Sequence, residues 1–231
     1  MAQKINPQVL YEDNHLLVLN KPAGWLVQGD KTGDNTLTDW GRAYIRKKYN
    51  KPGEAFLHPV HRLDRPVSGV CVFARTSKAL ERMNKLFHDD KINKTYVAIV
   101  KGAPEKDEDR LTHWLTKDSE KNIAKAHTKQ KGNAKYAELS YKLQGSISGH
   151  ALLEVKPKTG RPHQIRVQLA KIKCPIKGDL KYGYPTPNSD KNISLHAYKI
   201  AFVHPVKKEP MSISCKPKWD DFNPLINGMD R

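Results

Sequence analysis

The strongest structural signal in the chain is the segment His58-Pro-Val-His-Arg-Leu-Asp-Arg-Pro-Val-Ser-Gly69, which runs directly into Val70-Cys-Val-Phe-Ala74. Its prolines fix φ and its glycine permits a tight turn, so it predicts a stiff, irregular connection. The apolar, β-branched residues that follow predict a buried strand. Asp64 therefore sits on a rigid loop beside a core strand, a suitable place for a catalytic carboxylate. A surface Asp paired with its arginine neighbours is an alternative interpretation.

The chain is strongly basic, with 41 Lys and Arg against 24 Asp and Glu among 231 residues, a formal net charge of +17. A hydrophobic content of 38% predicts a soluble globular protein with a sizeable core. The positive excess favours nucleic acid as partner, because neutralising phosphates releases condensed counterions. A basic surface that only maintains solubility is the alternative. No long apolar span or basic amphipathic anchor is present, so no membrane partner is expected.

The three cysteines, Cys71, Cys174 and Cys215, are widely spaced and form no CxxC pair. The N-terminal residues lack the apolar core of a signal peptide. Together these features predict a cytoplasmic protein with reduced thiols.

No cofactor or metal is expected from the motifs. Glycine-rich phosphate loops are absent, which removes support for nucleotide-driven or redox catalysis. His58, His61 and Asp64 could in principle form a zinc or iron site. Pro59 and Pro66 oppose a helix that presents all three, and no fourth ligand is signalled.

Hydrophobic periodicity predicts many short strands and few helices. Besides 70–74, strands are predicted in 9–20 (two, around a turn at 12–14), 94–101, 136–143, 151–156, 195–203 and 211–215. Helices are predicted at 36–49, 77–88 and 161–170, the last with Thr159 or Gly160 at its cap and Pro162 in its first turn. Residues 102–135 are the least regular, and 178–187 predict a turn-rich loop. Without a βαβ period, internal repeat or clear linker, this indicates an α+β fold and a single domain of residues 1–231.

A second constellation, Lys158-Thr-Gly-Arg-Pro-His-Gln-Ile-Arg166, lies far downstream of the first. Together with His61-Arg-Leu-Asp-Arg65 and Ser68-Gly69, it closely resembles the RluA-type pseudouridine synthases. Further matching segments occur in the family's order: Glu12-Asp-Asn14, Asn20-Lys-Pro-Ala-Gly24, Lys94-Thr-Tyr-Val-Ala98, Gly178-Asp-Leu-Lys-Tyr-Gly183 and Leu195-His-Ala197. Several motifs in register make the resemblance specific.

The resemblance implies the pseudouridine synthase fold, a long mixed and mainly antiparallel sheet with flanking helices and a central active-site cleft. It also implies a cofactor-independent isomerase that converts specific uridines of structured tRNA or rRNA to pseudouridine. The extra N-terminal RNA-binding domain of some relatives is expected to be absent, and a monomer without an obligate protein partner is expected. The chain departs from the family at Val67, where a threonine is frequent.

Three catalytic residues follow from the resemblance. Asp64 matches the essential carboxylate, as a nucleophile or as a base on the ribose. Arg161 matches its cationic partner, which would offset the cost of burying the charge. Tyr96 matches a tyrosine that stacks on the base and handles the carbon-5 proton. Alternative interpretations are a solvated helix-surface arginine and a core strand tyrosine.

RNA contacts are expected from five basic residues, namely Arg62, His61, Lys21, Arg166 and Lys181. Arg62 resembles the family residue that can insert where the flipped base was, although a phosphate contact or a salt bridge explains it nearly as well. The lysines between 117 and 135 add plausible backbone contacts. The competing function is a non-catalytic RNA-binding or RNA-chaperone protein on the same fold.

Overall fold

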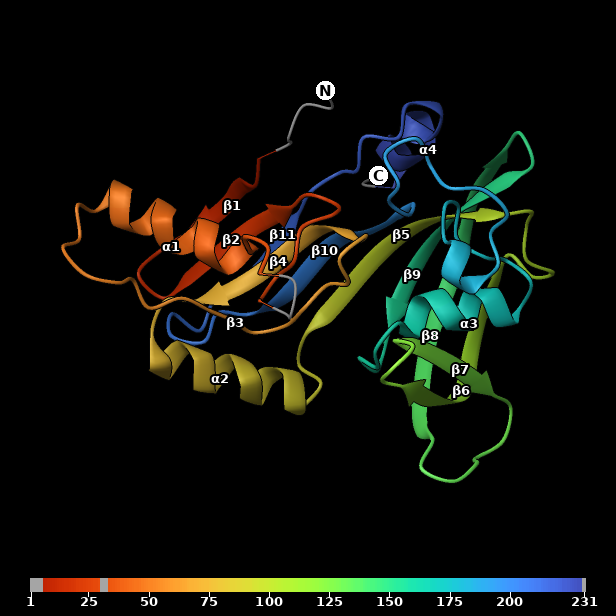
Figure 1. The fold of residues 1–231 in the computed structure, drawn as a ribbon, viewed down its shortest axis with the longest axis horizontal. Helices are drawn as coiled ribbons and strands as arrows, with labels where there is room; N and C mark the ends of the chain where they lie inside the picture. The colour runs from red at the N-terminus through yellow and green to blue at the C-terminus, as the bar shows by residue number, and fades with distance from the viewer. Residues whose placement is uncertain (1–5, 30–32, 230–231) are drawn as a thin grey trace. The chain divides into compact units, whose positions relative to one another are not determined.

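The computed structural model describes residues 6–29 and 33–229. The chain divides into two compact units (Figure 1). Unit 1 consists of Met1–Lys94 and Ala197–Pro217, and unit 2 of Thr95–His196 and Lys218–Arg231. Each unit combines antiparallel strand pairs with helices, in agreement with the α+β prediction.

Unit 1 is built on strands in the order β1-β2-β4-β10, with β3 paired to β4 and β11 paired to β10. The pairs β1–β2, β2–β4, β3–β4 and β10–β11 are antiparallel. The strand bounds are β1 Gln8–Glu12, β2 Leu16–Lys21, β3 His58–Pro59, β4 Ser68–Ala74, β10 Leu195–Val203 and β11 Pro210–Ser214. These confirm the predicted strands of this unit, and β3 is an additional short one.

The apolar run at residues 16–19 is buried on both faces of β2, because side chains alternate along a strand. Leu16 and Val18 pack with Met83 of helix α2 (Ser77–His88). Leu17 points the other way, and its side chain lies near Gly41 of helix α1 (Leu37–Lys48). The two helices thus cover opposite faces of the sheet.

Both helices of unit 1 begin where the sequence predicts. Thr36 caps α1, and its side chain forms a reciprocal capping box with Asp39. The Thr76 hydroxyl accepts a hydrogen bond from the Ala79 amide at the start of α2. These caps satisfy amide groups that would otherwise lack intrahelical partners.

Unit 2 has the strand order β5-β9-β8-β6-β7, and the pairs β5–β9, β8–β9, β6–β8 and β6–β7 are antiparallel. The strand bounds are β5 Asn93–Lys101, β6 Glu108–Asp118, β7 Ile123–His127, β8 Lys135–Ile147 and β9 His150–Pro157. The predicted hairpin of β8 and β9 is confirmed, with a tighter turn than expected.

The expectation of irregular structure at 102–135 was wrong, because this region contains β6 and β7. In β6, the buried side chains of Leu111, His113 and Leu115 alternate with more exposed ones. The dense charges around this alternation obscured the two-residue period of a strand.

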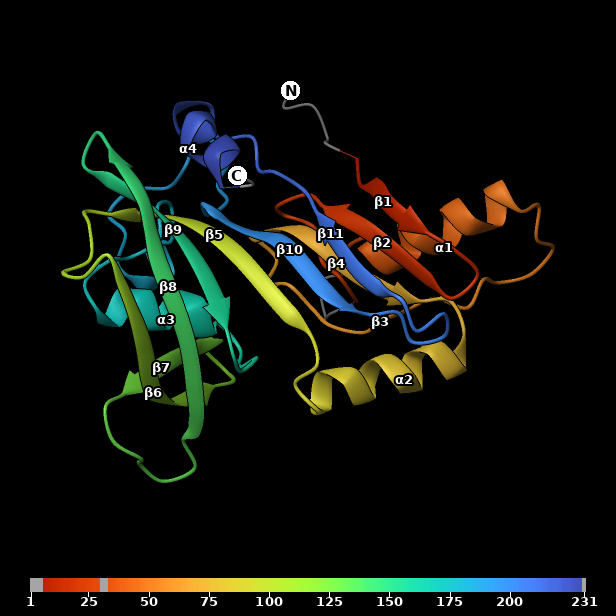
Figure 2. The same cartoon turned by 180° about the vertical axis from the view of Figure 1, so that it is seen from behind.

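Helix α3 (Gln164–Lys171) begins at Gln164 rather than at Arg161. His163 has a left-handed backbone with φ 54°, which places Pro162 in a turn before the helix. Thr159 is not the cap, since its hydroxyl donates to Gln164 Oε1 at 2.7 Å. In Figure 1 α3 crosses in front of β8 and β9, and in Figure 2 it lies behind them, so it covers one face of this sheet.

The predicted turn-rich loop at 178–187 is confirmed and contains a short 3₁₀ helix, η1 (Leu180–Tyr182). A second 3₁₀ helix, η2 (Asp220–Phe222), leads into α4 (Asn223–Gly228), and neither was predicted. Leu225 of α4 lies over Gly145, which forms a bulge in β8.

Gly69 marks a close approach between two strands of unit 1. Its φ is +115°, and a Cβ atom at this position would lie 2.3 Å from the Ala197 carbonyl oxygen.

Gly69→Ala should therefore lower the free energy of unfolding by about 3 kcal/mol, through backbone strain and overpacking. Urea denaturation measures the change. Gly53→Ala is the control, because nothing lies within 4 Å of its added methyl group; equal stability of both variants would contradict the close approach.

Candidate active site

Asp64 lies in a tight turn between β3 and β4 of unit 1. The Val67 amide donates to the Asp64 carbonyl at 3.0 Å and closes the turn. The neighbouring side chains of Leu63 and Val67 are buried, with 8% and 3% of their surface exposed. The partly exposed Asp64 is thus held between two hydrophobic anchors, as a catalytic group on a rigid loop requires.

Lys21 was expected to contact RNA, but its side chain is completely buried. The ammonium group donates to the carbonyls of Pro22, Trp25 and Arg65 at 3.2, 2.7 and 3.0 Å. Burial lowers the pKa of Lys21 to about 7, while electrostatic interactions with Cys71 and Asp64 act in the opposite direction. Lys21 therefore supports the Asp64 turn from inside and does not offer its charge to a phosphate.

His61 was also expected to contact RNA, and the structure gives it an internal role. Its Nε2 accepts a hydrogen bond from the Val72 amide at 3.1 Å, and its ring packs against Phe87 at 5.4 Å between centroids. Burial, together with the nearby charge of Lys94, lowers the pKa of His61 to about 4. A neutral imidazole that accepts from the backbone fixes the loop to β4 and carries no charge for RNA.

Two arginines flank Asp64 on the exposed side of the loop. Arg62 is exposed, in keeping with an RNA contact. Arg65 donates from Nε to the Gly24 carbonyl at 3.1 Å and forms an ion pair of 2.9 Å with Asp34. Its side chain therefore binds the protein itself, at Gly24 and Asp34.

Tyr96 lies on β5 of unit 2, opposite Val155 of β9. Its side chain is partly exposed, whereas residues 97–100 of the strand are buried. A tyrosine at the exposed end of an otherwise buried strand can present its ring to a base.

Arg161 is fixed by the turn that precedes α3. Its Nε donates to the Tyr136 carbonyl at 3.0 Å, and its amide donates to Gln164 Oε1 at 2.9 Å. The buried Gln164 also receives the Thr159 hydroxyl and donates to the Glu138 carbonyl at 2.9 Å. Sequence reasoning did not single out Gln164, although it lies inside the motif and its amide can bind several groups of one turn.

Arg166 was expected to contact RNA, and the structure buries it instead, with 5% of the residue exposed. Its Nε and Nη2 donate to the two oxygens of Asp179 at 2.7 and 2.8 Å. This bidentate pair joins α3 to the loop of η1 and satisfies the buried charge. Lys181, in contrast, is exposed, and its Nζ donates to the Asn122 carbonyl at 3.1 Å.

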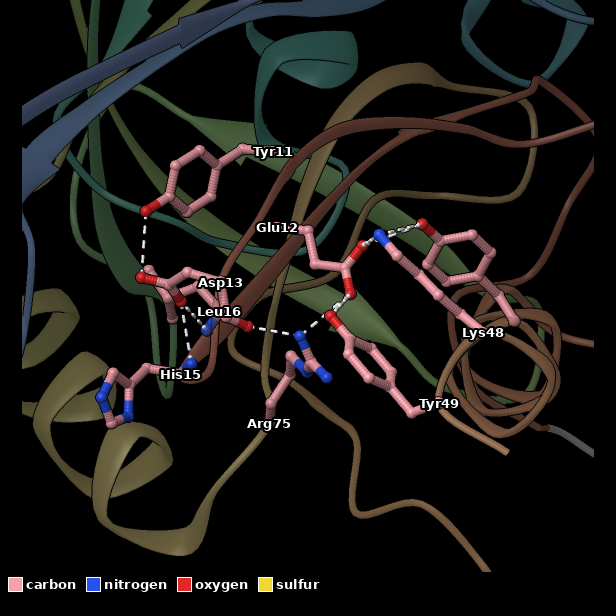
Figure 3. Close-up of polar contacts among 9 residues, drawn as sticks. Tyr11, Glu12, Asp13, His15, Leu16, Lys48, Tyr49 and Arg75 are labelled. Atoms are coloured by element: carbon pink, nitrogen blue, oxygen red, sulfur yellow. Dashed lines mark hydrogen bonds and ion pairs between the residues drawn. The ribbon is translucent and has the colours of Figure 1, made fainter. Parts of the chain in front are cut away.

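The acidic motif at 12–14 forms hydrogen bonds and ion pairs with side chains from several elements of unit 1 (Figure 3). Glu12 accepts hydrogen bonds from Lys48, Tyr49 and Tyr44 and pairs with Arg75. Burial alone would raise the pKa of Glu12, but these donors lower it to about 2.

Asp13, next in the chain, accepts the amides of His15 and Leu16, each at 2.8 Å, and the hydroxyl of Tyr11 at 2.9 Å. Its pKa is held well below its usual value, because these hydrogen bonds and the Lys207 charge outweigh burial. Both carboxylates of the motif are satisfied internally, so the motif fixes the β1–β2 turn.

Among residues 6–29 and 33–229, no three His, Cys, Asp or Glu side chains gather as potential metal ligands. In the same described part of the chain, no helix is long and apolar enough to span a membrane.

Lys21 should give the stability of the protein a distinctive pH dependence. Its folded pKa of about 7 lies below the usual 10.5, so between these values the unfolded chain binds more protons. Wild type should therefore gain stability relative to Lys21→Met as pH rises from about 7 to about 10. Urea denaturation across this range measures the difference. The exposed Lys78→Met serves as a control with a constant difference, and a constant difference for Lys21→Met would contradict the lowered pKa.

The chain matches known proteins over most of its length. A family model described as RNA pseudouridylate synthase matches residues 15–171. The chain is 32% identical over 224 residues to tRNA pseudouridine synthase C of Vibrio cholerae, covering 89% of each protein. It is 34% identical over 228 residues to ribosomal large subunit pseudouridine synthase C of Buchnera aphidicola, covering 95% of this chain and 70% of that protein.

A solved structure supports the same assignment. Human RNA Pseudouridylate Synthase Domain Containing 4 is similar with a TM-score of 0.75 and 25% identity, over 95% of this chain and 91% of that one. The fold class expected from the motifs is thereby confirmed. The chain belongs to the RNA pseudouridylate synthase family, in its RluA-type branch, and is an enzyme of the isomerase class.

Proposed function

We propose that this enzyme converts specific uridines of structured tRNA or rRNA into pseudouridine, with Asp64 as the essential carboxylate. The observation that carries the proposal is the Asp64 turn, in which the carboxylate residue lies between buried anchors and the next residue, Arg65, accepts a hydrogen bond from the fully buried Lys21 through its carbonyl. An acid on a rigid turn is held in one orientation for the chemistry of the substrate. The similar proteins named for tRNA and ribosomal RNA support these substrate classes.

The reaction breaks the glycosidic bond of uridine, turns the base and rejoins it through carbon 5. Atoms and electrons balance within the substrate, so neither a cofactor nor an energy donor is required. Asp64 supplies the catalytic carboxylate, and both the nucleophilic route and the route through a base on the ribose are compatible with its role.

Unit 2 supplies the other two proposed catalytic residues. The guanidinium of Arg161 stabilises the negative charge of Asp64, and Tyr96 stacks on the uracil and takes part in the transfer of the carbon-5 proton. As the family resemblance implies, we propose that residues 1–231 act as one catalytic domain.

RNA binding is proposed to rest on exposed cations. Arg62 inserts where the flipped base was, or binds a neighbouring phosphate, and Lys181 contacts the backbone. Exposed lysines between β6 and the start of β8 extend this surface: Lys117, Lys121, Lys125, Lys129, Lys131 and Lys135. A net charge of +17 favours such a partner.

The proposed setting is the cytoplasm, with the protein as a monomer. Cys71 and Cys174 are buried and Cys215 is partly buried. Burial raises the pKa of the Cys71 thiol to about 12, so it stays protonated and unreactive. These thiols are suited to a reducing compartment.

Asp64→Asn should abolish turnover and leave RNA affinity within a few fold, because the amide keeps the shape of the side chain and loses its charge. Tritium release from tRNA and rRNA labelled at uridine carbon 5 measures the reaction, and filter binding measures affinity. Asp89→Asn, on the surface of α2's C-terminal turn, should behave as wild type. Loss of binding in proportion to activity would favour a non-catalytic RNA-binding protein.

Reversing the charge of Lys117, Lys121 and Lys125 to Glu should weaken RNA binding and flatten its dependence on salt. Each lost phosphate contact lowers the slope of log K against log salt by roughly 0.7 to 0.9. The same reversal at the exposed Lys78, Lys85 and Lys91 of unit 1 is the control. An equal effect of both triple variants would indicate a general loss of charge rather than an RNA surface on the hairpin.

A further inference from the structure

Tyr182 of η1 joins two parts of unit 2 that lie far apart in sequence. Its hydroxyl accepts a hydrogen bond from the Ala124 amide of β7 at 2.9 Å. The same hydroxyl lies 2.7 Å from Nδ1 of His163, at the start of α3. One side chain therefore connects the β6–β7 hairpin with the turn that carries Arg161.

Further contacts make this connection stiff. The guanidinium of Arg166 lies over the Tyr182 ring at 5.0 Å and is bound by both oxygens of Asp179. On the hairpin side, Lys181 donates to the Asn122 carbonyl at 3.1 Å. The ring of Tyr182 is thus fixed by a buried ion pair, and the hairpin end is fixed to η1 at two successive points.

The hydrogen bonds of Tyr182 also favour one form of His163. A hydroxyl that accepts the Ala124 amide can donate its own hydrogen to Nδ1 of His163. In the neutral imidazole this arrangement places the ring hydrogen on Nε2. With the hydroxyl as donor to Nδ1, the connection orients the ring and favours the tautomer with its hydrogen on Nε2.

His163 itself occupies a strained position. Its φ of 54° is sparsely populated by residues other than glycine and persists only where the surroundings impose it. It is two residues from Arg161, whose amide is held by Gln164. A change in the His163 side chain is consequently transmitted to the Arg161 turn through a short, constrained backbone.

We propose that Tyr182 is a positioning residue that couples RNA contact at the β6–β7 hairpin to the Arg161–His163 turn. The inference rests on the proposed function, in which the hairpin lysines bind phosphate. RNA on these lysines holds β7, the Ala124 amide then holds the Tyr182 hydroxyl, and this hydroxyl fixes His163. An RNA that is long enough to reach the hairpin is accordingly turned over faster than a short one with the same uridine.

The test compares Tyr182→Phe with Tyr184→Phe. The first variant removes the hydroxyl and keeps the ring beneath Arg166. The second removes a tyrosine hydroxyl that lies 2.7 Å from Nε2 of His150, a similar Tyr–His contact away from α3. Turnover is measured by tritium release from the full-length RNA that wild type modifies and from a short stem-loop that carries the same uridine.

Wild type and Tyr184→Phe should turn over the full-length RNA about tenfold faster than the stem-loop. Tyr182→Phe should lose this difference in kcat and keep its affinity for the full-length RNA, because every hairpin lysine remains. Nitrogen NMR of labelled histidine should show His163 with its hydrogen on Nε2 in wild type and a mixture of tautomers in Tyr182→Phe.

The following results would overturn the inference. Tyr182→Phe could retain the wild-type ratio between the two RNAs, or it could slow both equally, which is the sign of a purely structural residue. An unchanged His163 spectrum would contradict the hydrogen-bond path. Absence of tritium release by wild type from every RNA pool would overturn the proposed function and this coupling with it, and so differs from a failure of the coupling alone.

Discussion

The buried ammonium of Lys21 is the interaction on which the candidate active-site loop depends. A charge removed from water is costly unless the protein supplies partners, and here three backbone carbonyls do so. One of them belongs to Arg65, whose carbonyl also accepts the Gly24 amide at 2.8 Å. The segment after β2 and the Asp64 turn are thus joined around one cation. The family motifs at 20–24 and 61–65, separate in sequence, form one structural element.

Much of the fold could be predicted from the sequence, because its core segments have clear periods. The run at 16–19, the strand after Gly69 and the amphipathic helix at 77–88 all lie where their apolar residues indicate. Prediction failed at β6 and β7, where lysines and acids surround the few buried residues of each strand. It also failed at the start of α3, because the left-handed backbone of His163 depends on tertiary contacts that no local propensity encodes.

The candidate site shows a different limit of sequence reasoning. Motifs identified the residues, and a basic side chain within an RNA-binding protein suggested a phosphate contact. Three of these basic residues are instead engaged inside the protein. Burial lowers the pKa of Lys21 and of His61, and Asp179 binds the guanidinium of Arg166. Residue type alone cannot distinguish an exposed cation from one that holds two loops together. Glu12 and Asp13 show the same limit for acids, since their partners come from distant elements.

Unit 1 is formed by two segments that are far apart in the chain, and this affects how it folds during synthesis on the ribosome. Its sheet order β1-β2-β4-β10 places a strand from the end of the chain beside one formed near its start. Until residues of β10 leave the exit tunnel, one edge of β4 lacks its partner and its backbone groups remain open to pairing with another chain. Unit 2, most of which is one continuous segment, can close earlier. The nascent protein therefore passes through a period in which chaperone protection of the incomplete N-terminal sheet matters most, and this period ends with the emergence of β10.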